Sequence, residues 1–432
     1  MLSEDKNRLL TRVGPGTPMG NLMRRYWQPI AAVTELDDKP IKAVRLMGED
    51  LVLYRDLSGT YGLTDRQCAH RRADLSYGFV EKHGIRCNYH GWCFNEKGAC
   101  VEQSFEETVK PGGLKDDVRI KAYPVEVRGG LLWAYLGPEP APICPNWEPF
   151  TWKNGFVQIV LSEIPCNWFQ CQENSIDPVH FEWMHSNWTI RLGGATGPYS
   201  PTHTKLGFDE FDYGFIYRRV RTDTSEQDPL WTVGRTCLWP NCLFTGDHFE
   251  WRVPIDDERT LSVGWFYNRV PKEREPYEQN RIPYWYGPIK GPDGRWISSH
   301  VMNQDFIAWV GQGTIADRTG EYLGASDRGI AMIRRRFFQD LETVANGGDP
   351  KAIVRDPKLK DVIELPVLAR KILTQGLTRA ELEKHPLYGK GLKGFVFQAG
   401  QPPEIWRAFN DAMGSPHDAP QGTPQTLPPG AE

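Results

Sequence analysis

Four side chains that can bind a metal lie in two short stretches of the sequence. Cys68 and His70 are separated by one residue, and after sixteen further residues Cys87 and His90 are separated by two. Two thiolates and two imidazoles can hold a tetrahedral zinc ion, or a [2Fe–2S] cluster in which histidines replace the cysteines on one iron. Common zinc fingers group Cys with Cys and His with His, whereas each stretch here has one of each. The mixed order therefore predicts the iron–sulfur cluster.

The order Cys-x-His, then Cys-x₂-His, resembles that of Rieske proteins, and Arg71 and Gly91-Trp92 extend the similarity. A zinc-bound structural protein is the alternative, and it predicts a colourless preparation. High-potential respiratory Rieske proteins have an extra Cys pair and a serine after His-Gly, which these stretches lack. We therefore expect few hydrogen bonds to the cluster sulfurs and a reduction potential near the low end of the Rieske range.

A second set of candidate ligands begins with His180 and His185. Two histidines and one carboxylate form the facial triad of non-haem Fe(II) oxygenases. Five residues correspond to about 140° around an ideal helix, so a helix through both histidines must bend or stop between them. For the carboxylate we select Asp305. Asp317 and Asp327 are the alternatives, and each could instead be a helix cap or an ion-pair partner.

The composition excludes several classes of protein. The 432 residues carry a net charge of −4 with a pI near 6.2, and no basic run is present, so a nucleic-acid partner is not expected. No apolar stretch approaches the roughly 18 residues of a membrane span, and the acidic start of the chain argues against a signal peptide. Seven of the nine cysteines lie outside the cluster stretches without a disulfide-framework spacing. We therefore expect free thiols, a cytoplasmic location and no membrane partner.

The chain is long enough for two or three domains, and its pattern changes at a proline-rich stretch, residues 138–142. Before this stretch the pattern predicts short strands and a hairpin around residues 78–84. We predict a helical segment at residues 1–27 that packs on the catalytic part, an all-β [2Fe–2S] domain at 28–142, a catalytic domain at 143–414 and a disordered tail at 415–432.

The helix and strand signals predict an α+β catalytic part, with a mostly antiparallel sheet and helices against one face. A helix is predicted between residues 169 and 187. Ser326 is expected to cap an amphipathic helix whose apolar stripe includes Ile333 and Phe337, and Ser3 to cap a first helix. Predicted strands of the whole chain include residues 42–47, 50–56, 60–65, 156–161, 205–210, 215–222, 231–239, 249–254 and 260–267.

Together these motifs resemble the Rieske non-haem iron ring-hydroxylating oxygenase α subunits. After the cluster motif come Glu-Asn-x₂-Asp-x₂-His-x₄-His at residues 173–185, Gln-Asp at 304–305 and Asp-Arg-Thr-x-Glu at 317–321. Residues 13–20 look like the phthalate dioxygenase branch, which also includes aryl-ether O-demethylases, and the similarity extends to about residue 345. One departure is Arg72, where the family usually has glycine. This change beside a cluster ligand would affect reductase docking or the cluster potential and not ligation.

The resemblance implies an α+β fold, with an all-β Rieske [2Fe–2S] domain followed by a helix-grip catalytic domain, and a homotrimer. The implied cluster ligands are Cys68, His70, Cys87 and His90, and the implied ligands of one mononuclear non-haem Fe(II) are His180, His185 and Asp305. Asn174 and Asp177 are the implied catalytic residues, and in this family the residue at Asp177 joins a cluster histidine to an iron histidine across a subunit boundary. The alternative is that Asp177 is a helix N-cap, with Pro178 at the first helical position.

The electrons are expected to come from a second protein. The chain has no Gly-x-Gly-x-x-Gly turn for a dinucleotide, and its two Cys-x₄-Cys pairs lack the next cysteine of a plant-type ferredoxin. NAD(P)H is therefore expected to act only through a separate reductase, for which a ferredoxin-type protein is one form.

The expected function is that of a terminal oxygenase, which uses O₂ and reductase electrons to cis-dihydroxylate an aromatic, carboxylated compound. The alternatives are an O-demethylating monooxygenase of a methoxy-aromatic or aryl ether, and a pure Rieske electron carrier, which predicts a single metal site. A carboxylated substrate calls for a buried arginine, and Arg235 is the candidate. Its alternative is a solvent-facing strand residue, while Arg218, Arg219 and Arg221 are expected on a solvated face.

Overall fold

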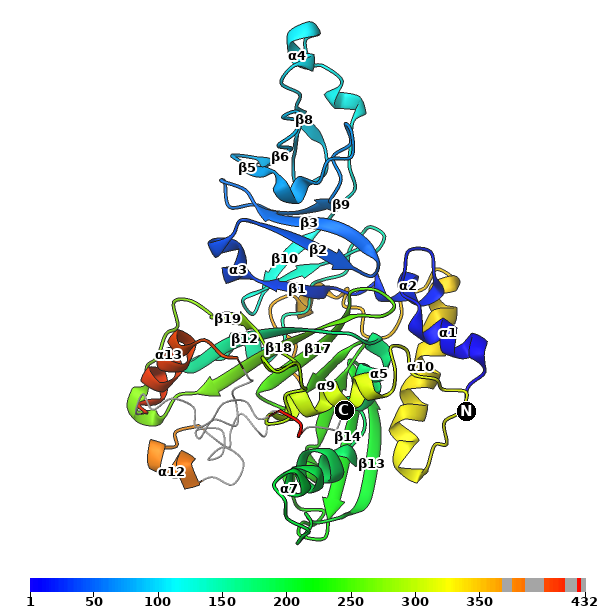
Figure 1. Cartoon of the computed structure of the whole chain (residues 1–432), viewed down its shortest axis with the longest axis vertical. Helices are drawn as coiled ribbons and strands as arrows, with labels where there is room; N and C mark the ends of the chain where they lie inside the picture. The colour runs from blue at the N-terminus through cyan, green and yellow to red at the C-terminus, as the bar shows by residue number, and fades with distance from the viewer. Residues whose placement is uncertain (367–374, 385–399, 416–425, 429–432) are drawn as a thin grey trace. The chain divides into compact units, whose positions relative to one another are not determined.

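The structure is a computed structural model, and it describes residues 1–366, 375–384, 400–415 and 426–428 (Figure 1). The chain forms two compact units. The β unit comprises residues 13–146 and 353–361, and the α+β unit comprises residues 1–12, 147–352 and 362–432. Most of the predicted disordered tail lies outside the described residues, but Leu427 is buried and its N–H donates to the Trp296 carbonyl oxygen. Among the described helices, none has the length and apolar character needed to cross a membrane.

The β unit consists of three small antiparallel sheets, ordered β1-β11-β10, β2-β3-β4-β9 and β5-β6-β7-β8. The strands predicted at residues 42–47, 50–56 and 60–65 and the hairpin around 78–84 are confirmed. The strands are β1 (Gln28–Ala32), β2 (Ile41–Leu46), β3 (Glu49–Arg55), β4 (Tyr61–Asp65), β5 (Phe79–Glu81), β6 (Gly84–Arg86), β7 (Cys93–Phe94), β8 (Cys100–Glu102), β9 (Ala122–Tyr123), β10 (Val125–Arg128) and β11 (Leu131–Ala134). Its helices are α2 (Pro18–Met23), α3 (Val33–Asp38) and α4 (Glu106–Val109).

The α+β unit is built on one eight-stranded sheet, ordered β13-β14-β15-β16-β17-β18-β12-β19. All neighbouring strands are antiparallel except β12 and β19, as the sequence predicts for a mostly antiparallel sheet. The strands are β12 (Gly155–Ile164), β13 (His203–Phe211), β14 (Gly214–Arg221), β15 (Arg235–Leu238), β16 (Cys242–Phe244), β17 (His248–Pro254), β18 (Thr260–Arg269) and β19 (Tyr284–Tyr286).

Helices cover one face of this sheet (Figure 1). A single buried cluster joins Val160 and Phe266 of the sheet to Cys171 of α5 and to Phe306 and Trp309 of α9. Side chains of a strand alternate between the two faces, so every second residue of the central strands points toward these helices. The helices are α1 (Glu4–Thr11), α5 (Trp168–Asn174), α6 (His180–Glu182), α7 (Trp188–Leu192), α8 (Pro229–Thr232), α9 (Val301–Gly311), α10 (Arg328–Ala345), α12 (Arg379–Lys384) and α13 (Pro403–Met413).

The helix predicted between residues 169 and 187 is interrupted, because α5 ends at Asn174 and the chain becomes helical again only at His180, where α6 begins. Two further predicted element boundaries are wrong. The strand predicted at residues 231–239 is divided into α8 and β15, because Asp228 caps α8 by accepting from the Leu230 N–H at 2.8 Å, with Pro229 at the first helical position. Gly234 then turns the chain with φ at 77°. The helix predicted from Ser326 begins only at Arg328, because a 3₁₀ turn precedes it.

A buried carboxylate, Glu173, links α5 to two arginines from distant parts of the chain. Arg318 donates to it from Nη2 at 2.6 Å and from Nε at 3.1 Å, and Arg334 of α10 donates from Nε at 2.6 Å. Arg318 also donates to Asn7 of α1 at 3.0 Å, and Arg334 to Glu321 at 2.8 Å. The motif at residues 317–321 therefore fixes α5, through two of its side chains, to α1 and α10.

Glu173→Gln is expected to lower the free energy of unfolding of the α+β unit by about 3–5 kcal/mol, because it leaves two buried guanidinium groups without their shared anion. Glu210→Gln is the control. Glu210 pairs with Arg336 and Lys351 at a more exposed position, and its loss should cost less than about 1 kcal/mol. Chemical denaturation followed by tryptophan fluorescence measures both, and equal losses would contradict the role of the buried network.

Candidate metal sites

The first cluster stretch folds into a loop around the backbone of Cys68. The Cys68 N–H donates to the Ala73 carbonyl oxygen at 2.8 Å, and the Arg72 N–H donates to the Cys68 carbonyl oxygen at 2.9 Å. Cys68 is buried, and it joins the hydrophobic core that forms between the second and third sheets of the β unit. His70, two residues along, is half-buried at the edge of that core.

The second stretch repeats this backbone pattern. The Cys87 N–H donates to the Trp92 carbonyl oxygen at 2.9 Å, and the Gly91 N–H donates to the Cys87 carbonyl oxygen at 3.0 Å. In both loops the cysteine donates to the residue five positions later and accepts from the residue four positions later. Cys87 is buried, whereas His90 is exposed.

The structure brings all four predicted cluster ligands together. The ring centroids of His70 and His90 lie 4.5 Å apart, and burial, together with the neighbouring Cys87, raises the pKa of Cys68 to about 11. His70 stacks on Trp92 at 4.5 Å, and its Nδ1 is buried without a hydrogen-bond partner. A buried polar atom of this kind is uncommon unless another group binds it. Two adjacent thiols and two imidazoles, one with an orphaned nitrogen, fit a Rieske cluster.

Arg72 has a backbone conformation that favours glycine. Its φ is 60°, and at the equivalent position of the second loop Gly91 has a φ of 76°. A side chain in this left-handed region costs roughly 1–2 kcal/mol. The position therefore explains physically why glycine is usual there, and it identifies Arg72 as a point of strain beside the cluster ligands.

Arg72→Gly is expected to stabilise the first loop by about 1 kcal/mol, because glycine adopts the same φ without strain. Gly91→Ala is the reciprocal variant, and its Cβ would lie 3.0 Å from the Ser104 hydroxyl oxygen. The rate at which heated protein loses the visible absorbance of its cluster should fall in the first variant and rise in the second. Faster loss in Arg72→Gly would show that the guanidinium stabilises the loop more than its backbone strains it.

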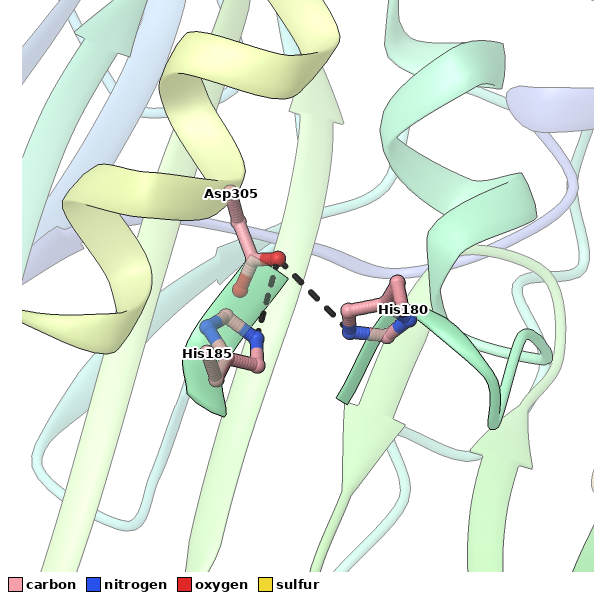
Figure 2. A group of neighbouring side chains, drawn as sticks. All are labelled: His180, His185 and Asp305. Carbon is pink, nitrogen blue, oxygen red and sulfur yellow. Dashed lines mark ion pairs between the residues drawn. The ribbon is translucent and has the colours of Figure 1, made fainter. Parts of the chain in front are cut away.

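His180, His185 and Asp305 converge in the α+β unit, with Asp305 coming from α9 (Figure 2). Asp305 Oδ1 lies 3.3 Å from His185 Nε2 and 3.7 Å from His180 Nε2. The ligand atoms that the three residues offer all lie within 4.8 Å of one another. Two imidazoles and one carboxylate at this spacing fit a mononuclear Fe(II) site with positions left for other ligands.

A π-helical turn brings the two histidines to the same side. After α6 the chain continues as η4 (Trp183–Asn187), in which the Trp188 N–H bonds to the Trp183 carbonyl oxygen five residues earlier. A π turn places residues i and i+5 near each other, and such turns are frequent at functional sites. The predicted interruption between His180 and His185 is therefore a widening of the helix, which then continues as α7.

Gln304 holds His185 in place. Its amide nitrogen donates to the Thr189 hydroxyl and to the Ser298 carbonyl oxygen, both at 2.9 Å, so its Oε1 faces His185 Nδ1, also at 2.9 Å. This oxygen accepts a hydrogen bond from the His185 Nδ1–H, which leaves the Nε2 lone pair free on the side of Asp305. This role of Gln304 is not apparent from the sequence motifs, and its position next to Asp305 is the one signal that points to it.

Asp305 is ionised although it is buried. Burial raises the pKa of Asp305, but His185, His180 and the nearby Arg252 lower it by more, so the net shift is downward. Asn174, a predicted site residue, donates from Nδ2 to Asp305 Oδ1 at 3.2 Å. The carboxylate thus offers one negative charge to balance a divalent cation between two imidazoles.

Asp177 lies on the other side of the His180 ring. Its Oδ2 is 3.7 Å from His180 Nδ1, while its Oδ1 accepts from the Val179 N–H at 2.9 Å. His180 Nδ1 is buried and has no hydrogen-bond partner in the structure. The contact with Val179 resembles a cap, but α6 begins at His180 with Val179 as its N-cap residue. One carboxylate oxygen of Asp177 therefore remains directed at the iron-site histidine.

The alternative carboxylates lie elsewhere and bind backbone groups. Asp317 is exposed, and its Oδ1 accepts from the Thr319 N–H at 2.8 Å. Asp327 accepts from the Gly324 N–H at 2.6 Å, ahead of α10. Neither residue belongs to the group around His180.

The expectation that Arg219 lies on a solvated face is wrong. Arg219 is 6% exposed, donates from Nη1 to the Pro178 carbonyl oxygen at 3.4 Å, and lies 4.5 Å from the centroid of the Phe181 ring. Its neighbour Arg218 points to the opposite face of β14, where it pairs with Asp209 at 2.7 Å. The alternation of side chains along one strand accounts for the difference.

Asp305→Ala is expected to lower the iron content of the purified protein by about one atom per chain and to leave its acid-labile sulfide unchanged, because only the mononuclear site loses a ligand. Asp317→Ala is the matched control and should retain all iron. Metal analysis with sulfide determination measures both variants. Loss of iron in Asp317→Ala instead would identify Asp317 as the third ligand.

Two family models match the chain. The Rieske [2Fe-2S] domain matches residues 26–123, and the LigXa C-terminal domain like family matches residues 238–363. The chain is 61% identical over 414 residues to the 5,5'-dehydrodivanillate O-demethylase oxygenase subunit of Sphingobium sp. (strain NBRC 103272 / SYK-6), covering 96% of this chain and 97% of the relative. It is 34% identical to the phenoxybenzoate dioxygenase subunit alpha of Ectopseudomonas oleovorans, covering 80% and 87%, and 33% identical to the phthalate 4,5-dioxygenase oxygenase subunit of Pseudomonas putida, covering 80% and 88%.

Solved structures share the fold at lower identity. The QL mutant of Pseudomonas putida CBB5 NdmA, solved with theobromine, superposes with a TM-score of 0.55 at 20% identity, covering 76% of this chain and 93% of that chain. Dicamba monooxygenase superposes with a TM-score of 0.53 at 16% identity, covering 76% and 99%. These similarities bear out the predicted fold class, a Rieske domain of β sheets with a catalytic domain of sheet and helices.

Proposed function

The chain belongs to the Rieske non-haem iron oxygenases, and on that premise we propose that it O-demethylates a methoxylated aromatic acid of the 5,5'-dehydrodivanillate type. It is a terminal oxygenase component with a Rieske cluster and a mononuclear iron, and proteins of this kind receive electrons from separate partner proteins. The observation that carries the proposed reaction is the 61% identity to an O-demethylase oxygenase subunit along 97% of that relative. The predicted cis-dihydroxylation thereby becomes the second candidate.

The proposed reaction converts an aryl methyl ether into a phenol and formaldehyde. One atom of O₂ enters a methyl C–H bond, the resulting hemiacetal releases formaldehyde, and the other atom leaves as water. Two electrons and two protons complete the balance, and the electrons come from NAD(P)H through a separate reductase. When bound, the mononuclear iron supplies O₂ activation and the cluster supplies single electrons.

The residues of this chain have distinct parts in that reaction. His180, His185 and Asp305 would hold the iron, and Gln304 fixes the tautomer and orientation of His185. Asn174 donates to Asp305, which restrains the carboxylate that balances the charge of the metal. In the β unit, Cys68 and Cys87 with His70 and His90 would hold the cluster. Both ligand sets are inferred from the short distances between these side chains and from the buried, unpaired Nδ1 of His70.

The proposed path for electrons crosses from one subunit to the next in a homotrimer. Asp177 supports this path, because one of its oxygens faces His180 Nδ1 and its side chain is 27% exposed. His90 is exposed as well, so a neighbouring chain can approach both groups. The carboxylate would then accept hydrogen bonds from an iron-site histidine and from a cluster histidine of the adjacent chain.

The second candidate, cis-dihydroxylation, is favoured by the names of the phenoxybenzoate and phthalate dioxygenase relatives, at 33–34% identity. It predicts a dihydrodiol in which both atoms of O₂ are retained and from which no formaldehyde is released. The proposed O-demethylation predicts a catechol-type product in which a hydroxyl replaces the methoxyl group. None of the nine cysteines, all of which lie in the described residues, forms a disulfide, which supports the further proposal of a reducing, cytoplasmic location.

Holoenzyme supplied with 5,5'-dehydrodivanillate, O₂, NADH and a ferredoxin-linked reductase is expected to release one formaldehyde for each methyl group removed. The measurement combines O₂ uptake, formaldehyde assay and product mass. The same assay with phthalate is the control for dioxygenation. A dihydrodiol from either compound, without formaldehyde, would overturn the O-demethylase assignment in favour of the second candidate.

A further inference from the structure

We infer that Arg235 binds the carboxylate of the aromatic ring that is oxidised at the iron site. This inference rests on the proposed function, because it takes an aromatic acid as substrate, and it adds the side chain that would recognise the acid group. Arg235 is the first residue of β15, where its backbone lies opposite Tyr217 of β14.

The side chain of Arg235 points toward the face of the sheet that the helices cover. Cys237, two residues later on the same strand, accepts a hydrogen bond from Gln172 Nε2 of α5 at 3.1 Å. Residues two positions apart on a strand lie on the same face. Arg235 therefore shares the face of the sheet on which α5 and the iron-site residues lie, and the expected alternative of a solvent-facing position does not apply.

One aromatic ring connects Arg235 to the iron-site histidines. The guanidinium carbon lies 4.3 Å from the centroid of the Phe181 ring. The same ring lies 5.1 Å from the ring of His185 and 4.4 Å from the ring of His180. The Arg235 guanidinium carbon is therefore no farther from the centroid of the His185 ring than the Arg235–Phe181 and Phe181–His185 distances added together. The guanidinium is thus near enough to the iron-site histidines to meet a carboxylate on an aromatic ring that binds beside them.

Arg235 has no carboxylate within ion-pair distance among the residues that the structure describes, and its Nε is buried without a hydrogen-bond partner. Two other arginines, whose Nε atoms are likewise buried without a hydrogen-bond partner, do have a carboxylate partner. Arg252 on the same face pairs with Glu250 at 3.1 Å, and Arg221 pairs with Asp223 at 3.0 Å. A guanidinium whose Nε is buried without an acceptor is costly. An anionic ligand that enters beside Phe181 would remove this cost.

A guanidinium suits a carboxylate better than an ammonium does. Its planar set of N–H groups can donate two parallel hydrogen bonds to the two carboxylate oxygens. Packing against Phe181 restrains the plane of the group, so less rotational freedom is lost when the ligand binds. In a biaryl acid such as 5,5'-dehydrodivanillate, the carboxylate of the ring nearer the iron is the one within reach. The second carboxylate lies one ring further away.

The test compares Arg235→Gln with Arg218→Gln in holoenzyme that contains both metals. Arg218 is a matched control, because it lies on the adjacent strand but faces the other way and pairs with Asp209. The probes are 5,5'-dehydrodivanillate and its diamide, which has the same shape without the negative charges. Arg235→Gln is expected to raise the KM for the acid about 10- to 100-fold, the equivalent of one or two charge-assisted hydrogen bonds, and to leave the diamide unaffected. Arg218→Gln should change neither, and Arg235→Lys should recover part of the loss.

An equal loss with acid and diamide would overturn the inference, because it would assign Arg235 to the packing of Phe181 alone. An unchanged KM for the acid would overturn it as well. Failure of the proposed function has a different signature, in which the wild-type protein demethylates neither probe. Calorimetric titration with benzoate and benzamide then decides the role of Arg235 separately. Preference for benzoate that disappears in Arg235→Gln supports the carboxylate site, and the same binding in both proteins refutes it.

Discussion

The buried carboxylate of Glu173 is the group on which the arrangement of the α+β unit depends. It accepts hydrogen bonds from Arg318 and Arg334, which reach it from a loop and from α10. Two buried guanidinium groups and one carboxylate are stable together only when each has its partners. The three segments therefore have to be in place at once. Asn174 follows Glu173 directly, and the iron-site histidines follow within the next turns of chain, so this network also fixes the start of the metal-binding segment.

The same unit places charge where a sheet usually has an apolar core. On β17, Glu250 and Arg252 point toward the helices and are almost fully buried, and Ser262 donates to Glu250 at 2.9 Å. His248 on the same face has a pKa lowered to about 3 by burial first and then by Arg252, so it is neutral. Charges in such surroundings interact more strongly than charges in water. Arg252 adds to the stabilisation of the ionised Asp305.

The sequence was sufficient for those parts of the site that depend on local spacing. The mixed Cys and His pairs and the two histidines five residues apart are visible as local motifs, and the structure brings the members of each set together. Asp305, 120 residues after His185, was selected over Asp317 and Asp327 from the order of motifs in the family that the chain resembles, and the structure places it beside the two histidines. The parts that depend on tertiary packing were not visible. Nothing local distinguishes a π turn from an α turn at Trp183, because the difference is one hydrogen-bond register. The burial of Arg219 could not be predicted, because it depends on which face of β14 the helices cover. The start of β15 could not be predicted either, because the Asp228 cap and Pro229 favour a helical turn over the strand propensity of the residues that follow them.

The path of the chain through the two units has a consequence for biosynthesis. The α+β unit begins with residues 1–12, is interrupted by residues 13–146 of the β unit, and resumes at residue 147. On the ribosome, nearly all of the β unit therefore emerges before the sheet of the other unit exists. The two cluster loops of the β unit can therefore fold and receive iron and sulfide while translation continues. Helix α1, in contrast, has to wait for its partners, since Leu2 and Asn7 bond to residues 316–318. The end of the first β-unit segment at residue 146 and the synthesis of Asp305, the last iron-site ligand, are thus separated by about 160 residues, at the roughly 5–20 residues per second of translation.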